Sequence, residues 1–293
     1  MRYLDQRAIR ALGIAALVLA AVAAGNARAA IYEDTVLDDN PMLYWRLNET
    51  SGTTAADSSL FTRSGVYSGS VTLGAAGMPN GGNAVQFAGN DGRVTEEDGE
   101  NYLLGETSLA IEIWLKADEV GSDRGILGGS TTAGGDTVLS MRYDSSGYRG
   151  GGNDVIKIAF STNQGVQEYE SASGVQSTEW QHLVINWVSG QGIELYVNGV
   201  LDAGSAHGAN VDGTYTEGDV VGGALVGIDS LFLGESVKGD GTWLGLMDEF
   251  AVYDDPLSPG QIQEHYGNGI PEPATMLLLT GGALALLPKR RSA

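Results

Sequence analysis

The chain has 293 residues, including 44 Gly and no Cys, and its 37 Asp and Glu outnumber 16 Lys and Arg to give a net charge of -21. The 42% hydrophobic content is too high for a disordered chain, and the absence of Cys excludes a disulfide scaffold and a thiolate metal site. The acidic balance argues against a nucleic-acid partner, because phosphate neutralisation needs clustered Lys and Arg. High Gly with few charged residues favours an all-β domain with many tight turns.

The first 29 residues have the pattern of a secretory signal peptide. Three arginines within the first ten residues precede an uncharged apolar stretch at 11–24 and the small-x-small sequence Ala27-Arg28-Ala29. A stretch of 14 residues is short for a membrane span, which needs about 20. We therefore expect export and cleavage after Ala29, rather than an uncleaved anchor.

Alternating apolar and polar residues predict strands along most of the remaining chain. In the segment 109–115, aliphatic residues occupy every second position. Such alternation implies sheets buried on one face, so we predict two antiparallel sheets packed as a sandwich. The apolar faces contain the predicted core residues Trp45, Ile113, Trp187 and Phe250. The predicted strands lie within 43–47, 109–115, 138–141, 156–160, 183–187, 193–197, 231–233 and 244–253.

The strands belong to one predicted domain at 30–269, because no Pro-rich or Ser-rich linker divides it. Asn198-Gly199 predicts a tight hairpin turn. A Gly-rich stretch at about 204–229 is interpreted as an insertion. One short helix is expected at 258–266, with Ser258 as its N-cap and a proline directly after it.

A catalytic pair of carboxylates is not evident in the sequence. Retaining glycosidases hold two acids about 5 to 5.5 Å apart, and the comparable pattern here is Glu96, Asp98 and Glu100. Because Glu97 and Gly99 separate them in place of apolar residues, we interpret the segment as a solvated acidic loop.

The three histidines do not have the spacing of a zinc site. We expect His182 in a strand, His207 in the insertion and His265 on the terminal helix, all as structural or exposed residues. No Gly-x-Ser-x-Gly nucleophile motif is present either, so the sequence predicts a protein that is not an enzyme.

Carbohydrate binding requires exposed aromatic rings that stack on sugars, with polar groups around them. Tyr148, Tyr215 and Trp243 lie in or beside predicted loops and are the candidate ligand-binding residues. A packing role is the alternative for each of them. The Gly-rich segment 145–154 and the insertion are candidates for a binding rim, because loops on rigid scaffolds carry function.

Asp248 lies within an apolar series that runs from Leu244 to Val252 at every second position. A buried carboxylate is costly unless it is paired, hydrogen-bonded or bound to a metal. Asp248 is therefore a candidate Ca²⁺ ligand. The alternatives are a salt bridge to a buried arginine such as Arg46, acceptance of loop amides, or a β-bulge that turns the side chain outward.

The last 24 residues, 270–293, contain a distinct signal. Pro271-Glu272-Pro273 precedes a mostly apolar segment at 274–288 and the basic cluster Lys289-Arg290-Arg291. This order resembles the PEP-CTERM sorting signal of bacterial exported proteins. The resemblance implies a Gram-negative-type envelope, transient anchoring in the inner membrane, and cleavage near Pro271 by an exosortase-type enzyme. A plain tail anchor is the alternative, although 15 residues that include two Gly would span a membrane poorly.

Seven loose motifs follow one another in a recognisable order from Leu43 to Tyr266. Two of them are Glu179-Trp180-Gln181-His182-Leu183 and Gly245-Leu246-Met247-Asp248-Glu249-Phe250. In this order the motifs resemble a LamG-like, concanavalin A-like jelly-roll domain. The remaining five motifs lie at 43–58, 84–89, 111–114, 195–199 and 231–234.

The resemblance also bears on calcium, because many relatives of this fold contain Ca²⁺ sites. It implies Asp57 as a second ligand beside Asp248, since Asp57 lies in the Asp-Ser-Ser segment of the family's early loop. Asn90 is a weaker candidate. A structural Ca²⁺ is therefore the expected cofactor.

The sequence predicts an exported, non-catalytic recognition or adhesion module of the bacterial cell envelope or extracellular matrix. Its expected partner is an extracellular polysaccharide or another envelope component, besides the exosortase-type processing enzyme. The alternatives are a structural matrix protein without a discrete ligand and a divergent glycoside hydrolase, because the fold alone does not decide function.

Overall fold

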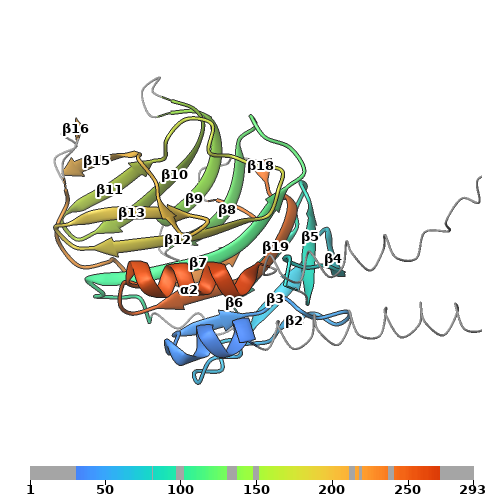
Figure 1. Cartoon of the computed structure of the whole chain (residues 1–293). Helices are drawn as coiled ribbons and strands as arrows, with labels where there is room; N and C mark the ends of the chain where they lie inside the picture. Colours follow the sequence, from blue (N-terminus) through green and yellow to red (C-terminus); the bar gives the residue numbers. More distant parts are fainter. Residues whose placement is uncertain are drawn as a thin grey trace, which may run out of the picture.

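The predicted alternation builds two large sheets that pack face to face (Figure 1). The computed structural model describes residues 31–80, 82–96, 102–130, 137–147, 152–210, 215–217, 220–236 and 241–270. The predicted signal peptide, and the predicted sorting segment after Ile270, lie outside these residues. The described strands confirm an all-β, antiparallel jelly-roll sandwich with a short C-terminal helix.

One sheet has eight strands among the described residues, and β7 and β19 lie at its centre. In order across the sheet they are β14 (Val200–Leu201), β13 (Gly192–Val197), β12 (Gln181–Val188), β7 (Ser108–Ala117), β19 (Leu244–Tyr253), β5 (Asn83–Ala88) and β4 (Val71–Ala76), with β1 (Leu43–Trp45) paired to β19.

The other sheet has eleven strands in the described part of the chain, and β8 to β11 form successive hairpin pairs within it. Its order is β16 (Tyr215–Glu217), β15 (Ser205–Asn210), β11 (Gly165–Glu170), β10 (Asn153–Thr162), β9 (Thr137–Ser146), β8 (Arg124–Ser130), β17 (Ser230–Leu233), β6 (Arg93–Glu96), β3 (Gly65–Ser68) and β2 (Thr54–Ala55), with β18 (Gly241–Thr242) beside β8.

The predicted turn and helix signals have the expected structures. Asn198 and Gly199 both have positive φ, 53° and 77°, which is the backbone of a type I′ hairpin turn between β13 and β14. Helix α2 (Pro259–Gly269) begins after Ser258, whose side chain accepts from the backbone of Gln261 in a capping box.

Two sequence interpretations need correction. Residues 31–38 form a second helix, whereas the sequence predicts only the C-terminal one. Tyr32 and Val36 bury one face of this helix, and their spacing of four residues fits it. Glu96 is not in a solvated loop, since it ends β6 and is 7% exposed. The predicted Gly-rich insertion contains β15 and β16, which extend the eleven-stranded sheet.

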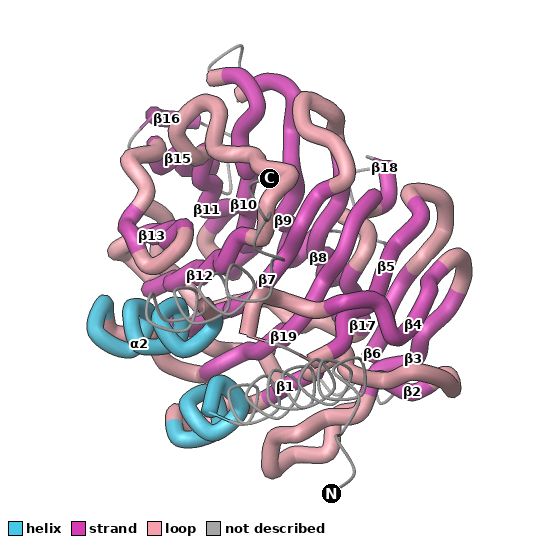
Figure 2. Tube along the Cα trace, turned by 45° about the vertical axis from the view of Figure 1, so that its right-hand side comes forward, coloured by secondary structure: helices cyan, strands magenta, loops and turns pink. Residues whose placement is uncertain are grey.

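The two helical segments lie on the same outer side of the sandwich, against the eight-stranded sheet (Figure 2). Asn268 of α2 donates to the Thr35 hydroxyl at 2.8 Å, which joins the two segments directly. No helix among the described residues is long and apolar enough to cross a membrane.

The core between the sheets contains all four residues that the sequence placed there. Trp45, Trp187 and Phe250 are fully buried, and Ile113 is 2% exposed. The ring of Trp187 stacks on Phe160 with centroids 5.5 Å apart. The predicted phase of these strands is therefore confirmed.

Replacing Trp187 with alanine should remove one of the largest buried rings and leave Phe160 without its stacking partner. We expect Trp187→Ala to lower the free energy of unfolding by about 3–5 kcal/mol, as measured by urea denaturation. Val200→Ala is the control, because Val200 is 69% exposed and its truncation should change stability by less than about 0.5 kcal/mol. Equal stabilities of the two variants would contradict the assignment.

Candidate functional site

The aromatic candidates have different surroundings. Trp243 is fully buried, and its indole N–H donates to the Leu246 carbonyl at 3.3 Å. Its ring meets Tyr143 edge-on at 5.1 Å, so no face of Trp243 is open to a ligand. Tyr148 lies outside the described residues. Of Tyr215, the structure describes the backbone, which lies in β16 and pairs with Ala209 of β15.

The carboxylate of Asp57 organises a turn. It accepts hydrogen bonds from the backbone N–H groups of Tyr44, Ser59 and Arg63 and from the Ser59 hydroxyl, at 2.7 to 2.9 Å. Each oxygen therefore receives two donors. Asn90 is exposed in the segment between β5 and β6.

Asp248 lies next to a β-bulge in β19. Asp248 pairs with Trp114 and Ala251 with Glu112, so two residues of β19 oppose one residue of β7. Met247 before the bulge and Phe250 after it both enter the core, and Asp248 points to the opposite side of the sheet. The expectation that Asp248 shares the interior with Phe250 is wrong, and the bulge alternative is confirmed.

Asp248 is nevertheless fully buried, because the segment after β4 covers it. One oxygen, Oδ2, accepts from the Met78 N–H at 2.9 Å, and Oδ1 has no partner among the described residues. A Cβ at Gly77 would lie 2.6 Å from Oδ2, so only glycine allows this approach. Burial and the neighbouring Glu249 raise the pKa of Asp248 well above its usual value.

Glu249 is the second acid of this pair. It is 1% exposed, and its carboxylate accepts from the Tyr44 hydroxyl and lies 3.7 Å from Nε of Arg46. Burial raises the pKa of Glu249 to about 7, although the Arg46 charge opposes the rise. Arg46, the partner that the sequence suggested for Asp248, thus pairs with Glu249 and also with Glu33 at 2.7 Å. In the described part of the chain, no group of three or more His, Cys, Asp or Glu side chains is arranged to hold a metal ion.

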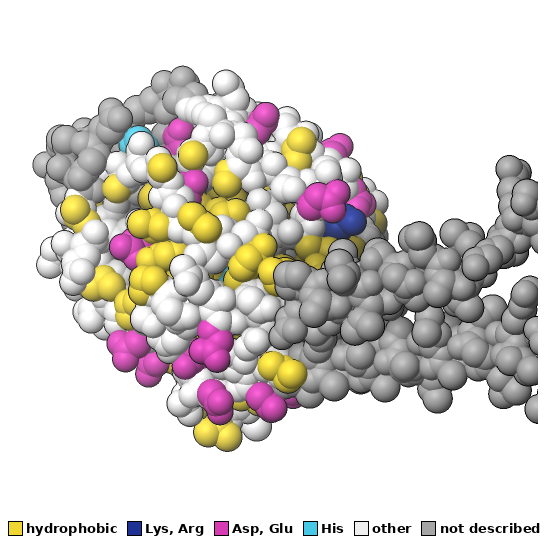
Figure 3. All heavy atoms as spheres, viewed as in Figure 1, with side chains coloured by type: hydrophobic (Ala, Val, Ile, Leu, Met, Phe, Trp, Pro, Cys, Tyr) yellow, Lys and Arg dark blue, Asp and Glu magenta, His cyan; other side chains and the backbone are white. Residues whose placement is uncertain are grey.

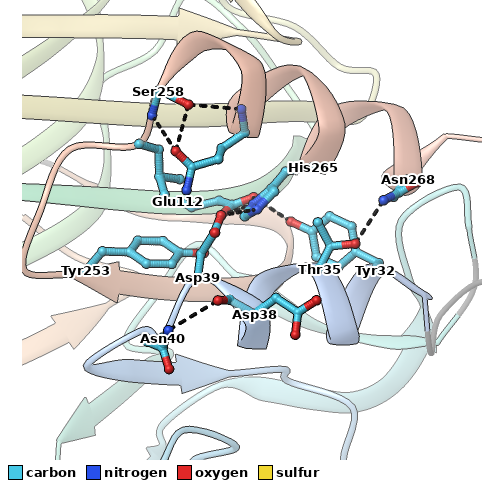
Figure 4. Close-up of polar contacts among 12 residues, drawn as sticks. Tyr32, Thr35, Asp38, Asp39, Asn40, Glu112, Tyr253, Ser258, His265 and Asn268 are labelled. Carbon is cyan, nitrogen blue, oxygen red and sulfur yellow. Dashed lines mark hydrogen bonds and ion pairs between the residues drawn. The ribbon is translucent and has the colours of Figure 1, made fainter.

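A second buried polar cluster lies between the eight-stranded sheet and the two helical segments (Figure 4). The carboxylate of Glu112 on β7 is fully buried and contacts His182 at 2.6 Å and His265 at 2.9 Å. It also accepts from the hydroxyls of Tyr32 and Tyr253, each at 2.7 Å. The carboxylate therefore joins β7, β12, β19 and both helical segments.

His265 lies between two carboxylates, because its Nε2 also meets Asp39 at 3.0 Å. Burial would lower the pKa of His265, but Glu112 and then Asp39 raise it to about 9. Burial would raise the pKa of Glu112, but His265 and His182 hold it well below its usual value. The cluster thus contains an imidazolium and a carboxylate at neutral pH.

This cluster resembles a catalytic carboxylate–histidine pair in its contacts but not in its access. Glu112, His182 and His265 are each fully buried, so a substrate cannot reach them. The hydroxyls that contact Glu112 belong to tyrosines that are themselves buried. The arrangement is an anchor for the helical segments.

The outer face of the eleven-stranded sheet is polar and sheltered from solvent. In β9 and β10, Arg142 and Lys157 are directly opposite each other and are 9% and 7% exposed. Both pair with Asp144, at 3.0 and 2.9 Å. Although burial would raise the pKa of Asp144, these cations and the backbone of Ser146 lower it.

The polar face continues across neighbouring strands. Lys157 is opposite Glu170 of β11, and Glu168 is opposite His207 of β15. Residues opposite each other in antiparallel strands share a face. The centre of this face contains Ser140, which is 1% exposed. Apart from His207, none of these residues is marked by the sequence, because polar residues that alternate with apolar ones have the pattern of an ordinary solvated face.

The fold and this face define a lectin-like β-sandwich. A family model described as the concanavalin A-like lectin/glucanases superfamily matches residues 80–263, which is more than half of the chain. The chain belongs to this superfamily. No curated protein matches the sequence.

Two solved structures illustrate the likeness. Domain 4 of AbnA, a GH43 extracellular arabinanase from Geobacillus stearothermophilus, in complex with arabinotriose, is 19% identical with a TM-score of 0.53, over 78% of this chain and 98% of that domain. The botulinum neurotoxin serotype D ligand-binding domain, in complex with N-acetylneuraminic acid, is 13% identical with a TM-score of 0.55. That match covers 79% of this chain and 51% of the toxin domain, so the chain spans about half of it. At these identities the likeness concerns the fold.

The His265 cluster predicts a loss of stability in alkali. A raised histidine pKa contributes stability that is complete below pH 6.5 and is lost as the pH rises through about 9. We expect the free energy of unfolding to fall as the pH rises from about 6.5 through about 9, and the part of this fall above about pH 8 lies beyond most of the titration of Glu249, whose pKa is about 7. Urea denaturation at a series of pH values between about 6.5 and 9.5 measures this free energy.

His265→Gln should be less stable at neutral pH and should lose most of the alkaline decline. His207→Gln is the control, because His207 lies on the other sheet. An unchanged decline in His265→Gln would show that another group is responsible.

Proposed function

We propose that this chain is an exported, non-catalytic glycan-binding module, and that its ligand lies along the polar outer face of β9, β10 and β11. Membership of the lectin/glucanase superfamily supports the proposal, as does the likeness to an arabinanase domain that was solved in complex with arabinotriose and is matched over 98% of its length. The observation that carries it is the row of ion-paired side chains, Arg142, Lys157 and Asp144, on a sheltered face of the sheet.

Ion pairing suits this face to sugars. Arg142 and Lys157 are held in place by Asp144, so they lose little side-chain freedom when a ligand binds. Sugar hydroxyls both donate and accept hydrogen bonds. A face with cationic donors beside carboxylate acceptors therefore matches them in both roles.

The binding proposal is tested by glycan-array binding of the full chain, followed by titration of the best ligand. Lys157→Met keeps the aliphatic stem and removes a charged donor, which typically contributes about 1.5–3 kcal/mol. We expect affinity to fall roughly 10- to 100-fold. Lys116→Met is the matched control, because Lys116 faces outward from β7 in the other sheet. Unchanged binding by Lys157→Met, with an unchanged melting temperature, would contradict the proposed face.

We also propose maturation at both ends, carried by the two terminal sequence signals. Cleavage after Ala29 and near Pro271 should release a chain that begins at Ala30 and lacks the apolar segment. Mass spectrometry of the native protein measures both termini. A mature form that retains Leu277 to Leu287 would contradict exosortase-type processing.

A structural Ca²⁺ remains a proposal, and Asp248 is the residue to test. Asp57 receives two donors on each oxygen, whereas Asp248 Oδ1 has no partner among the described residues. Calcium should raise the melting temperature by several degrees, at about 2–4 °C per kcal/mol of binding energy. Asp248→Asn should abolish the difference between calcium-loaded and chelator-treated protein. Identical melting of the wild type in both conditions would rule the cation out.

A further inference from the structure

The loop between β2 and β3 presents two apolar side chains to solvent. Leu60 is 89% exposed and Phe61 is 52% exposed. Among the aromatic side chains that the structure describes, Phe61 alone is more than half exposed. Exposed apolar residues gathered at one point mark interaction sites in soluble proteins.

The loop is rigid despite its exposure. The four hydrogen bonds that Asp57 accepts fix its first half. The Ser59 hydroxyl then accepts from the Phe61 N–H at 3.2 Å, and the Trp45 indole donates to the Arg63 carbonyl at 2.7 Å. The backbone on both sides of Phe61 is therefore held by the sandwich.

The ring of Phe61 is also held in orientation. The Arg63 guanidinium lies between two rings, 4.5 Å from the centroid of Phe61 and 4.1 Å from that of Tyr102. Thr62, between Phe61 and Arg63 in the sequence, has φ 59°, which a β-branched residue adopts only under constraint from its surroundings. The surroundings thus keep a strained backbone that presents a fixed aromatic ring to solvent.

We propose that Phe61 is a stacking platform for one sugar ring of a neutral glycan, a subsite separate from the sheet face; the inference rests on the proposed glycan-binding function. The polarised C–H groups of a sugar ring pack against the electron-rich face of an aromatic ring. A ring that is already held in place loses little entropy when the ligand binds.

Two observations favour a neutral sugar over other occupants. The hydroxyl residues Ser58, Thr62 and Ser64 belong to the same loop as Phe61. A pair of apolar side chains is also small beside the roughly 800 Å² per partner of a stable protein interface. The excess of acids repels polyanions, and Figure 3 shows acidic side chains outnumbering basic ones on the face in view.

The test uses the full chain and three variants of one residue. Arabinotriose and a panel of neutral oligosaccharides are titrated by calorimetry, and zwitterionic phosphatidylcholine vesicles are tested in parallel. Phe61→Ala and Phe61→Leu should weaken sugar binding about 3- to 10-fold, whereas Phe61→Trp should preserve it. Val120→Ala, at another exposed apolar position, is the control and should bind as the wild type does.

Each alternative outcome is distinct. Full sugar affinity in Phe61→Leu would overturn stacking, and Phe61-dependent binding to vesicles in place of sugars would identify a lipid-contacting loop. If Lys157→Met loses binding and every Phe61 variant binds as the wild type does, the stacking inference fails and the proposed function stands. If the wild type binds none of the sugars, both fail.

Discussion

The fully buried carboxylate of Glu112 is the interaction on which the arrangement of this domain depends. An unpaired charge at that depth would be very costly, and four side chains remove the cost by donating to it. The donors come from two strands and from both helical segments, so the first and last elements of the described chain meet at one acid. Removing the carboxylate would leave these donors unsatisfied together, and it would release both segments from the sheet.

Because the helical segments are anchored at Glu112, one outer face of the sandwich is covered by them and the other is not. Around Glu112, the eight-stranded sheet is covered by an apolar layer that includes Trp114, Val184 and Ile262, and its polar groups serve to hold that layer in place. The eleven-stranded sheet instead directs Arg142 and Lys157 away from the core. A ligand-binding role therefore falls to the second sheet and to the loops at the edges of the sandwich.

The sequence predicts the strands, turns and helix starts that depend on local periodicity and turn residues. It does not predict features that depend on contacts between segments distant in the chain. Alternation is sufficient for the strands, and Asn198-Gly199 and Ser258 are sufficient for a turn and a helix start. The bulge beside Asp248 has no local signal, because one extra residue in β19 is defined only by its register with β7. In the sequence, Glu112 has the position of a solvated polar residue in an alternating strand. Trp114 lies on the same face of that strand and is the one signal that this face is covered. The Phe61 ring was missed because no local pattern marks it, and part of the support of its loop comes from Trp45 on β1, whose indole donates to the Arg63 carbonyl.

The electrostatics of the polar sheet face decide which glycans suit it. The chain has 21 more acids than bases, yet two of its few cations, Arg142 and Lys157, lie together on this face. Because both pair with Asp144, and Glu170 lies opposite Lys157, the face presents no net positive field to attract a polyanion. It presents hydrogen-bond donors and acceptors side by side, an arrangement that favours a ligand whose groups both donate and accept hydrogen bonds. Neutral sugar hydroxyls have that property, whereas a carboxylate or sulfate group would meet a cation already neutralised and an acid that repels it.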